Sequence, residues 1–172
     1  MIKLIILDVD GVLSDGRKWY DSTGRTILKT FCDKDFTAIK KFRSGGCSVM
    51  FLSGDRSINE QMAKNRNIYF VYTRGRCKSE FLEQIKAKYN VVDNEIAFMG
   101  DDTFDKGLMD KLKYSFCPSD APKEVKLSCH KVLNNTGGNN CVLELYEYLL
   151  DNKLIRSYDM NKVYNIDKDE KW

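Results

Sequence analysis

Two carboxylates stand one residue apart near the start of the chain, directly after an apolar run. The run extends from Leu4 to Leu7, and Asp8, Asp10 and Gly11 follow it. Residues i and i+2 of a strand point to the same side, so both carboxylates are expected to leave the strand together. Negative charges so close are costly unless a cation lies between them or one group carries a proton. Mg²⁺ bound with a phosphate would supply that cation, whereas the alternative interpretation is an acidic, solvated turn.

A hydroxyl, a lysine and two further carboxylates occur where later predicted elements begin or end. Ser53 ends a second apolar run, Lys78 opens a predicted helix, and Asp101 and Asp105 follow another strand. In phosphoryl transfer one Asp can attack phosphorus and a second can protonate the leaving oxygen and then activate water. A hydroxyl and a lysine can stabilise the phosphoryl oxygens. Each residue alone also fits a plain turn, a surface lysine or an acidic helix N-terminus.

Short apolar runs alternate with amphipathic segments along the chain, and they must position these side chains. The predicted strands are residues 4–7, 47–52, 68–72, 96–99, 114–117 and 131–133. The predicted helices are residues 35–44 and 57–67, one from residue 78, short ones after residues 105 and 122, and residues 141–150. This alternation predicts an α/β fold with a doubly wound parallel sheet, whose strand ends would gather the polar residues at one edge.

The chain length favours one domain with two small additions. A chain of 172 residues can bury one sizeable core, and residues 1–150 hold the whole alternation. Residues 17–31 contain two β-prone runs around Gly24, which predicts a β-hairpin insert. Residues 151–172 are charged and lack clear periodicity, so we expect a C-terminal tail.

The composition argues against nucleic-acid and membrane partners. Net charge is only +3, from 28 basic and 25 acidic residues that are interspersed. No apolar stretch approaches the roughly 20 residues of a membrane span, and the N-terminus does not resemble a signal peptide. The six cysteines form no CxxC pair, which favours free thiols in a reducing cytoplasm over a metal cluster. The only histidine, His130, has no GxSxG partner and is expected to be structural.

The ten residues from Leu7 to Gly16, Leu-Asp-Val-Asp-Gly-Val-Leu-Ser-Asp-Gly, resemble motif I of the haloacid dehalogenase superfamily. Ser53, Lys78 and the run Gly100 to Asp105 stand in the order and spacing of motifs II, III and IV. The similarity covers about residues 3–149, most of the chain. It implies a Rossmann-like phosphatase core, and the insert at residues 17–31 is far too short for a cap domain.

The resemblance implies a role for each matching residue. Asp8 would be the nucleophile and Asp10 the general acid and base, with its backbone carbonyl binding Mg²⁺. Asp101 would bind the metal directly, and Asp105 would support it. Phosphate- and substrate-binding roles fall to Gly11, Ser53, Gly54, Asp55 and Lys78.

The tail of motif I is similar to that of the cap-less sugar-acid phosphatases, which act on eight-carbon octulosonate 8-phosphates or nine-carbon nonulosonate 9-phosphates. Three segments depart from the octulosonate branch. Asp55 stands where that branch usually has Arg, residues 34–36 read Lys-Asp-Phe for its usual Arg-Asp-Gly, and residues 137–143 lack its expected Arg. An acidic residue at position 55 would repel a substrate carboxylate held close, so we expect a nine-carbon acid 9-phosphate or a neutral sugar phosphate to be preferred.

In this subgroup the hairpin and the tail typically pack against neighbouring subunits of a homotetramer, which would replace the missing cap. An exposed hairpin is the alternative.

Two other functions stay open at this point. One is a phosphatase for a nucleotide or a polynucleotide 3′-phosphate, against which the weak net charge argues mildly. The other is a non-catalytic assembly module associated with sugar-nucleotide synthesis, against which the intact motif residues argue.

Overall fold

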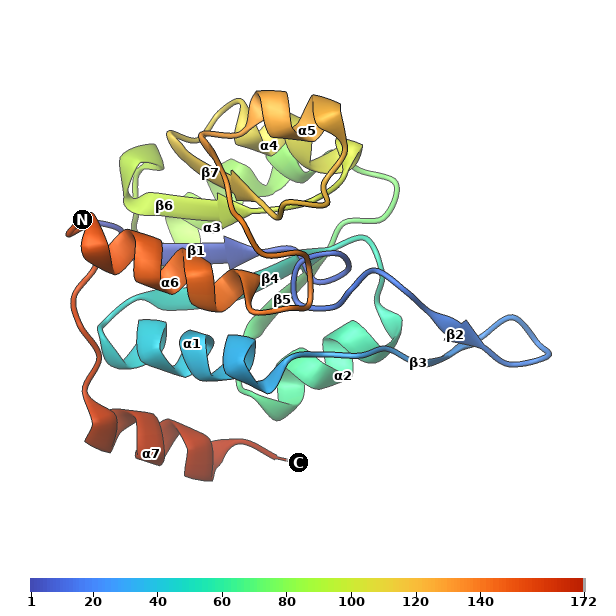
Figure 1. Ribbon diagram of the computed structural model, residues 1–172, viewed down its shortest axis with the longest axis horizontal. Helices are drawn as coiled ribbons and strands as arrows, with labels where there is room; N and C mark the ends of the chain where they lie inside the picture. Colours follow the sequence, from blue (N-terminus) through green and yellow to red (C-terminus); the bar gives the residue numbers. More distant parts are fainter. Residues whose placement is uncertain (172) are drawn as a thin grey trace.

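A parallel sheet of six strands forms the centre of the computed structural model, which describes residues 1–171 (Figure 1). The strands lie in the order β5-β4-β1-β6-β7-β8. Their bounds are β1 Leu4–Leu7, β4 Ser48–Ser53, β5 Tyr69–Tyr72, β6 Ile96–Met99, β7 Tyr114–Cys117 and β8 Lys131–Val132. The chain proceeds outward from β1 to β5 and then returns to β6 on the other side of β1. This confirms the predicted doubly wound sheet, and the crevice where the order reverses is the usual ligand site of such folds.

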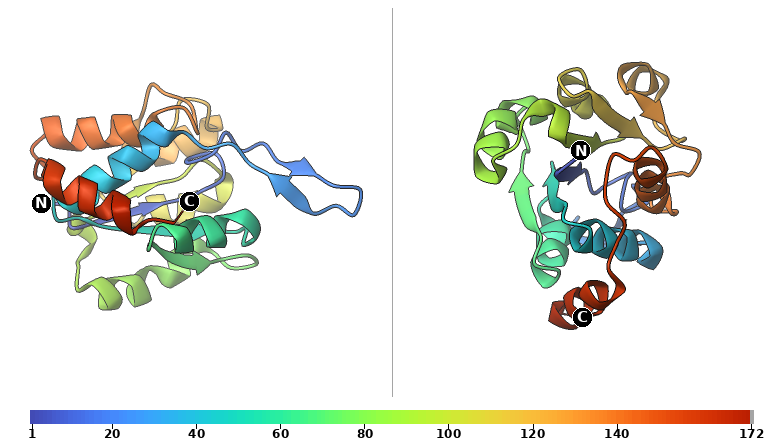
Figure 2. Two further views of the ribbon diagram at one scale, coloured as in Figure 1. Left: turned by 90° about the horizontal axis from the view of Figure 1, so that it is seen from below. Right: turned by 90° about the vertical axis from the view of Figure 1, so that its left-hand side faces the viewer.

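Helices cover both faces of the sheet (Figure 2). One face carries α1 Asp33–Ser44, α2 Ser57–Asn65 and α6 Cys141–Asp151. The other carries α3 Leu82–Tyr89, α4 Lys106–Met109 and α5 Lys123–Ser128. Short 3-10 helices are η1 Lys78–Phe81, η2 Asp93–Glu95 and η3 Thr103–Asp105.

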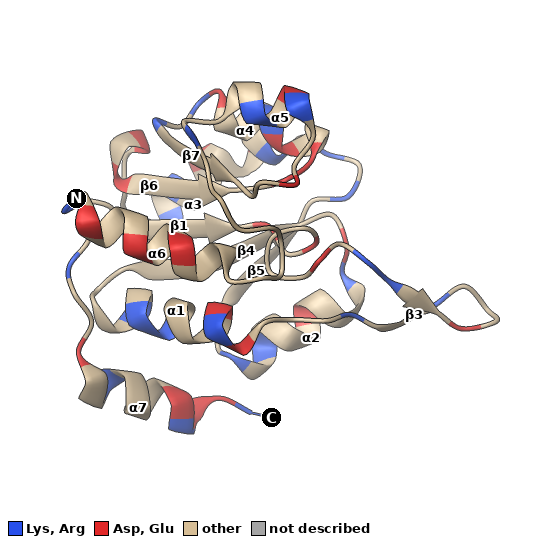
Figure 3. Ribbon diagram, in the orientation of Figure 1, with Lys and Arg blue, Asp and Glu red and all other residues tan. Residues whose placement is uncertain are grey.

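Strand β1 contributes to two hydrophobic cores, because its side chains alternate between the faces. Ile5 and Leu7 pack with α1 and α6, whereas Leu4 and Ile6 pack with α3 and α4. All four are fully buried, and each contributes roughly 1.5–3 kcal/mol relative to an exposed side chain. Strands β1, β4, β6 and β7 carry no charged residue, and charge gathers on helix surfaces and strand ends (Figure 3). The apolar strands therefore fix the positions of the polar residues that follow them.

The insert between β1 and α1 is the predicted hairpin, formed by β2 Trp19–Tyr20 and β3 Thr26–Leu28. It projects from the body of the molecule (Figure 1). No larger element stands between β1 and α1 in the described chain, so the expectation of a cap-less core is confirmed.

The segment after α6, expected as a C-terminal tail, contains helix α7, Met160–Asp169, which the sequence did not predict. The Asp159 carboxylate caps this helix by accepting a hydrogen bond from the Asn161 backbone N–H at 2.9 Å. Helix α7 lies beside α1, on the side away from the sheet (Figures 1 and 2). Lys40 of α1 forms ion pairs with Asp167 and Glu170, so the segment is anchored to its own chain. Within residues 1–171, none of the helices has the length and apolar character needed to cross a membrane.

Candidate active site

The two motif I carboxylates leave β1 at the crevice between β1 and β6. The Asp8 backbone N–H donates to the Met99 carbonyl at 2.9 Å, which extends the pairing of the two strands. The chain then turns sharply, and Gly11 has φ of +80°. A Cβ atom at Gly11 would lie 1.9 Å from an Asp101 carboxylate oxygen, so both conformation and space require glycine there. The turn thus brings the loop after β1 against the loop after β6.

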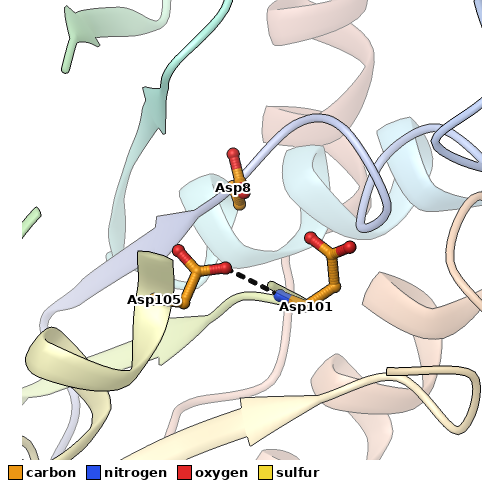
Figure 4. A group of neighbouring side chains, drawn as sticks. All are labelled: Asp8, Asp101 and Asp105. Atoms are coloured by element: carbon orange, nitrogen blue, oxygen red, sulfur yellow. Dashed lines mark hydrogen bonds between the residues drawn. The ribbon is translucent and has the colours of Figure 1, made fainter. Parts of the chain in front are cut away.

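Lys78 joins two buried carboxylates at this crevice. Its Nζ lies 2.7 Å from Asp8 Oδ2 and 2.5 Å from Asp105 Oδ1. The other Asp105 oxygen accepts hydrogen bonds from the backbone N–H groups of Asp101 at 2.8 Å and Asp102 at 3.0 Å. Asp105 therefore shapes the loop after β6 and orients Asp101. Figure 4 shows the three acidic side chains and the hydrogen bond from Asp101 to Asp105.

The carboxylates of Asp8, Asp101 and Asp105 fit a divalent cation. One oxygen from each lies within 4.8 Å of the others, and Asp101 Oδ1 is buried with no hydrogen-bond partner among residues 1–171. Hard oxygen ligands of this kind suit Mg²⁺. The three acidic groups and Lys78 leave an excess of negative charge that a cation would balance.

Burial makes Asp8 and Asp101 hard to ionise without such a cation. Burial raises the pKa of Asp8 to about 7, although the Lys78 ammonium lowers it in part. Burial also raises the pKa of Asp101 to about 8, and repulsion from Asp8 and Asp105 adds to that rise. Burial alone would lower the pKa of Lys78, but attraction to Asp8 and Asp105 holds it above its ordinary value. A bound cation would favour the ionised carboxylates.

A second network holds Asp10 on the other side of the cleft. Lys29 Nζ donates to Asp10 Oδ1 at 2.6 Å, to Asp55 Oδ2 at 2.9 Å and to Asn59 Oδ1 at 2.9 Å. The Asn59 amide in turn donates to Asp10 Oδ2 at 3.0 Å and to Ser53 Oγ at 3.1 Å. The Lys29 side chain has no exposed surface, although it comes from the base of the projecting hairpin. The hairpin therefore reaches back into the site.

Asp55 is paired with lysines, which corrects the electrostatic argument made for it from the sequence. Lys18 Nζ lies 2.7 Å from Asp55 Oδ2, the oxygen that also accepts from Lys29. Although burial opposes ionisation, hydrogen bonds from Lys18, Lys29 and Ser57 hold the pKa of Asp55 well below its usual range. The expectation of an unbalanced negative charge that repels a substrate carboxylate is therefore wrong.

The predicted site residues converge on one open cleft of about 460 Å³. Asp8, Asp10, Ser53, Gly54, Asp55, Lys78 and Asp101 line it. Asp105 is fully buried behind them, and Gly11 lies under the loop. Arg74, Arg76 and the exposed Phe104 form further parts of the wall and rim. The cleft thus offers a carboxylate pair, a hydroxyl and several cations to one ligand.

The segment at residues 137–143 supports the loop after β1 from behind. The Gly138 N–H donates to the Val12 carbonyl at 2.8 Å, and Cys141 Sγ donates to the same carbonyl at 3.0 Å. A Cβ at Gly137 would lie 1.9 Å from the Gly11 carbonyl oxygen. The Asp35 carboxylate accepts from the backbone N–H groups of Val142 and Leu143, both at 2.9 Å. Asp35 is therefore a helix cap for α6 and not a member of the cleft.

The cysteines and the histidine lie outside the cleft lining. All six cysteines are free, as expected, and Cys117 and Cys129 approach each other at 3.4 Å between sulfur atoms. His130 makes edge contacts with the rings of Tyr114 and Phe116, in agreement with a structural role.

Sequence reasoning missed Lys18, Lys29 and Asn59. Lysines in a hairpin and an asparagine in a helix ordinarily face solvent, so type and spacing gave no signal for them. One indirect signal existed, because an acidic residue at position 55 beside Asp10 requires nearby cations.

Residues 56–145 match the family described as haloacid dehalogenase-like hydrolase, which is more than half of the chain. The 3-deoxy-D-manno-octulosonate 8-phosphate phosphatase of Haemophilus influenzae is 31% identical over 150 residues, covering 87% of this chain and 83% of that protein.

Two solved structures share the fold over most of both chains. The cobalt-bound form of the Haemophilus influenzae phosphatase has a TM-score of 0.81 at 31% identity and covers 87% of this chain and 88% of its own. The Moraxella catarrhalis phosphatase, in complex with magnesium, phosphate and KDO, has a TM-score of 0.80 at 26% identity and covers 87% of this chain and 86% of its own. With its motif carboxylates gathered at one cleft and no cap, the chain belongs to the haloacid dehalogenase-like hydrolases, as a cap-less phosphatase similar to the octulosonate phosphatases.

Proposed function

We propose that the chain hydrolyses the phosphomonoester of a phosphorylated sugar acid, with Mg²⁺ as cofactor and a phosphoaspartate on Asp8 as intermediate. The observation that carries the proposal is that Asp8 and Asp10 line one cleft, each held by its own network. Its carboxylate meets Lys78 at 2.7 Å on one side, and Asp10 lines the same cleft two residues later. A nucleophile and a proton donor thus face one ligand space.

In the first half of the reaction an Asp8 oxygen forms a bond to phosphorus while the bond from phosphorus to the ester oxygen breaks. Asp10 gives its proton to that leaving oxygen. In the second half Asp10 takes a proton from water, and the water oxygen displaces Asp8 from phosphorus. Inorganic phosphate leaves, and both carboxyl groups return to their starting states.

The remaining residues bind and orient the phosphoryl group. Ser53 and Lys78 would donate to its oxygens, with backbone N–H groups around Gly11 and Gly54. The carboxylates of Asp8 and Asp101 and the Asp10 backbone carbonyl would hold Mg²⁺, with Asp105 in support. When bound, Mg²⁺ supplies positive charge beside the phosphoryl oxygens.

The cations of the cleft wall suit an acidic sugar phosphate. Lys18, Arg74 and Arg76 line the cleft beyond the reacting carboxylates, where a second negative group of the substrate would lie. The relatives from Haemophilus influenzae and Moraxella catarrhalis support this substrate class. In place of the arginine of the octulosonate branch, the chain has Asp55 with two lysines. Without that arginine the site lacks the paired N–H donors that could hold the carboxylate of a short sugar acid close to this position. On this ground we propose a nine-carbon acid 9-phosphate, or a neutral sugar phosphate, over the eight-carbon 8-phosphate.

A panel of phosphorylated metabolites tests this function directly. Purified protein is assayed for phosphate release with Mg²⁺ and with EDTA, and kcat/KM is compared among eight-carbon, nine-carbon and neutral sugar phosphates. Mg²⁺-dependent release that is fastest from a nine-carbon acid or a neutral sugar supports the proposal. Activity that survives complete chelation contradicts the metal assignment, and preference for the eight-carbon acid contradicts the substrate assignment.

The proposal includes a homotetramer in which hairpins meet neighbouring subunits. Trp19, Tyr20, Ile27 and Leu28 of the hairpin are all exposed, and Trp19 retains 64% of its surface. Apolar groups gathered on a projecting element are typical of an interface. Helix α7 adds exposed Met160 and Tyr164 on the segment predicted to share that interface. Light scattering should give four subunits for the wild type and a smaller species for Trp19→Ser with Ile27→Ser.

A further inference from the structure

Asn59 is a fully buried polar residue on α2 that lies between the motif I and motif II side chains. Its amide nitrogen is 3.0 Å from Asp10 Oδ2 and 3.1 Å from Ser53 Oγ, and its amide oxygen is 2.9 Å from Lys29 Nζ. A buried amide that satisfies three partners at once is a specific feature, because each unmade hydrogen bond there would cost free energy.

Lys29 determines which way the Asn59 amide faces. A lysine ammonium group only donates hydrogen bonds, so the amide oxygen must face Lys29. The two amide N–H groups are then directed to Asp10 and Ser53. Lys29 also donates to Asp10 Oδ1 at 2.6 Å, so each oxygen of the Asp10 carboxylate has its own donor. The carboxylate is thereby held against rotation.

The same network orients the Ser53 hydroxyl. Ser53 Oγ accepts from Asn59 and from the Asp55 backbone N–H, both at 3.1 Å. A hydroxyl has two lone pairs and one proton, so two accepted bonds leave the proton free to donate elsewhere. Ser53 lines the cleft, where a phosphoryl oxygen would be the acceptor.

We propose that Asn59 is a positioning residue for phosphoryl transfer, whose amide, oriented by Lys29, fixes Asp10 for proton transfer and turns the Ser53 O–H toward the phosphoryl group. The inference rests on the proposed phosphatase function and adds to it a residue outside the four motifs.

Asn59→Leu tests the role, because leucine fills a similar volume and removes all three hydrogen bonds. The probes are phenyl phosphate and p-nitrophenyl phosphate, which have similar size but differ in the acidity of the leaving oxygen. Phenoxide needs a proton from Asp10, whereas p-nitrophenoxide leaves with little help. General acid catalysis contributes about 10²–10⁴-fold. We therefore expect kcat to fall about 100-fold for phenyl phosphate and about 10-fold or less for p-nitrophenyl phosphate, with KM changed less than about 3-fold.

Gln61→Ala is the matched control, since Gln61 is an exposed residue of the same helix whose amide donates to Asn65 Oδ1 at 2.7 Å. It should leave both rates unchanged. Asn59→Ser, which is too short to bridge Asp10 and Ser53, is a second variant if leucine prevents folding, and circular dichroism reports the fold of each. Equal losses for the two probes would indicate a purely structural role and overturn the inference.

The proposed function and this inference fail in different ways. A wild-type protein that releases phosphate with Mg²⁺ neither from the two probes nor from the panel of sugar phosphates refutes both. An active wild type whose folded Asn59 variants keep the wild-type ratio of the two rates refutes only the role of Asn59.

Discussion

The two sides of the cleft differ in their balance of charge. On the acidic side (Asp8, Lys78, Asp101 and Asp105), three carboxylates surround one ammonium group. On the balanced side (Asp10, Lys18, Lys29, Asp55 and Asn59), two carboxylates meet two ammonium groups. The acidic side has more carboxylates than ammonium groups, so a bound cation would balance its charge. On the balanced side, carboxylates and ammonium groups are equal in number. Under the proposed function, the acidic side would bind the metal, and the balanced side would position Asp10.

Asp8→Asn should have the largest effect on the acidic side. The amide is a poor nucleophile, so kcat should fall by on the order of 10⁴–10⁶-fold while the fold persists. Steady-state kinetics with purified protein and Mg²⁺ measures this, and circular dichroism checks the fold. Substantial activity in a pure variant would remove Asp8 from the reaction.

The two buried lysines offer a direct comparison of the two sides. Lys78→Met leaves the acidic carboxylates without their ammonium group, and breaking a buried ion pair costs about 3–5 kcal/mol of unfolding free energy. Lys29→Met should cost only about 1–3 kcal/mol, because Lys18 stays 2.7 Å from Asp55.

Urea denaturation in EDTA gives both free energies. Added Mg²⁺ should restore part of the loss in Lys78→Met and little in Lys29→Met. Equal costs, or rescue of both variants by Mg²⁺, would mean that the two sides are not electrostatically distinct.

Metal removal should make stability depend on pH through the acidic side. In EDTA, Asp8 and Asp101 have pKa values of about 7 and about 8 in the folded protein, above the ordinary 3.8. The folded state therefore binds more protons than the unfolded state, and stability should fall as pH rises from about 4 to about 8.

Mg²⁺ at about 100 times its Kd should add about 2.7 kcal/mol of unfolding free energy, most visibly at the upper end of this range. Thermal denaturation across pH, with and without Mg²⁺, measures both effects. Asp101→Asn should flatten the metal-free profile and weaken the response to Mg²⁺. A flat wild-type profile in EDTA would contradict the assignment.

Asp55→Asn should give the smallest effect, and it acts on the balanced side. The change leaves Lys18 and Lys29 with one carboxylate fewer, so the cleft wall becomes more positive. KM for a sugar acid phosphate should fall about 5- to 10-fold, which corresponds to about 1–1.4 kcal/mol, while kcat changes little. Competition kinetics against p-nitrophenyl phosphate, which has no carboxylate, provides the control. A parallel fall in both KM values would show that the charge acts on the phosphate.

The acidic side was largely predictable from sequence, because its residues follow apolar strands directly. Once β1 and β6 are recognised as parallel neighbours, Asp8 and Asp101 must meet at one edge. Lys29 and Asn59 could not be placed in this way. Their burial depends on how the hairpin base and α2 pack on the sheet, and no periodic pattern encodes that contact.

The C-terminal helix was missed for a related physical reason. Most residues of helix α7 are polar or charged, and only Val163 among its residues is buried. Its stability comes from the Asp159 cap and from ion pairs with Lys40, which join residues far apart in the sequence. Such contacts appear only after the core has formed.

The support of the loop after β1 by residues 137–141 sets an order of events during synthesis. Strand β1 leaves the ribosome first, but the Val12 carbonyl gains its partners only when Gly138 and Cys141 have emerged. A nascent chain therefore carries Asp8 from the start, but without the contacts from residues 137–141 that shape the surrounding loop. The site is completed late, when α6 docks, so truncated chains that end before this helix should be inert toward cellular phosphate esters.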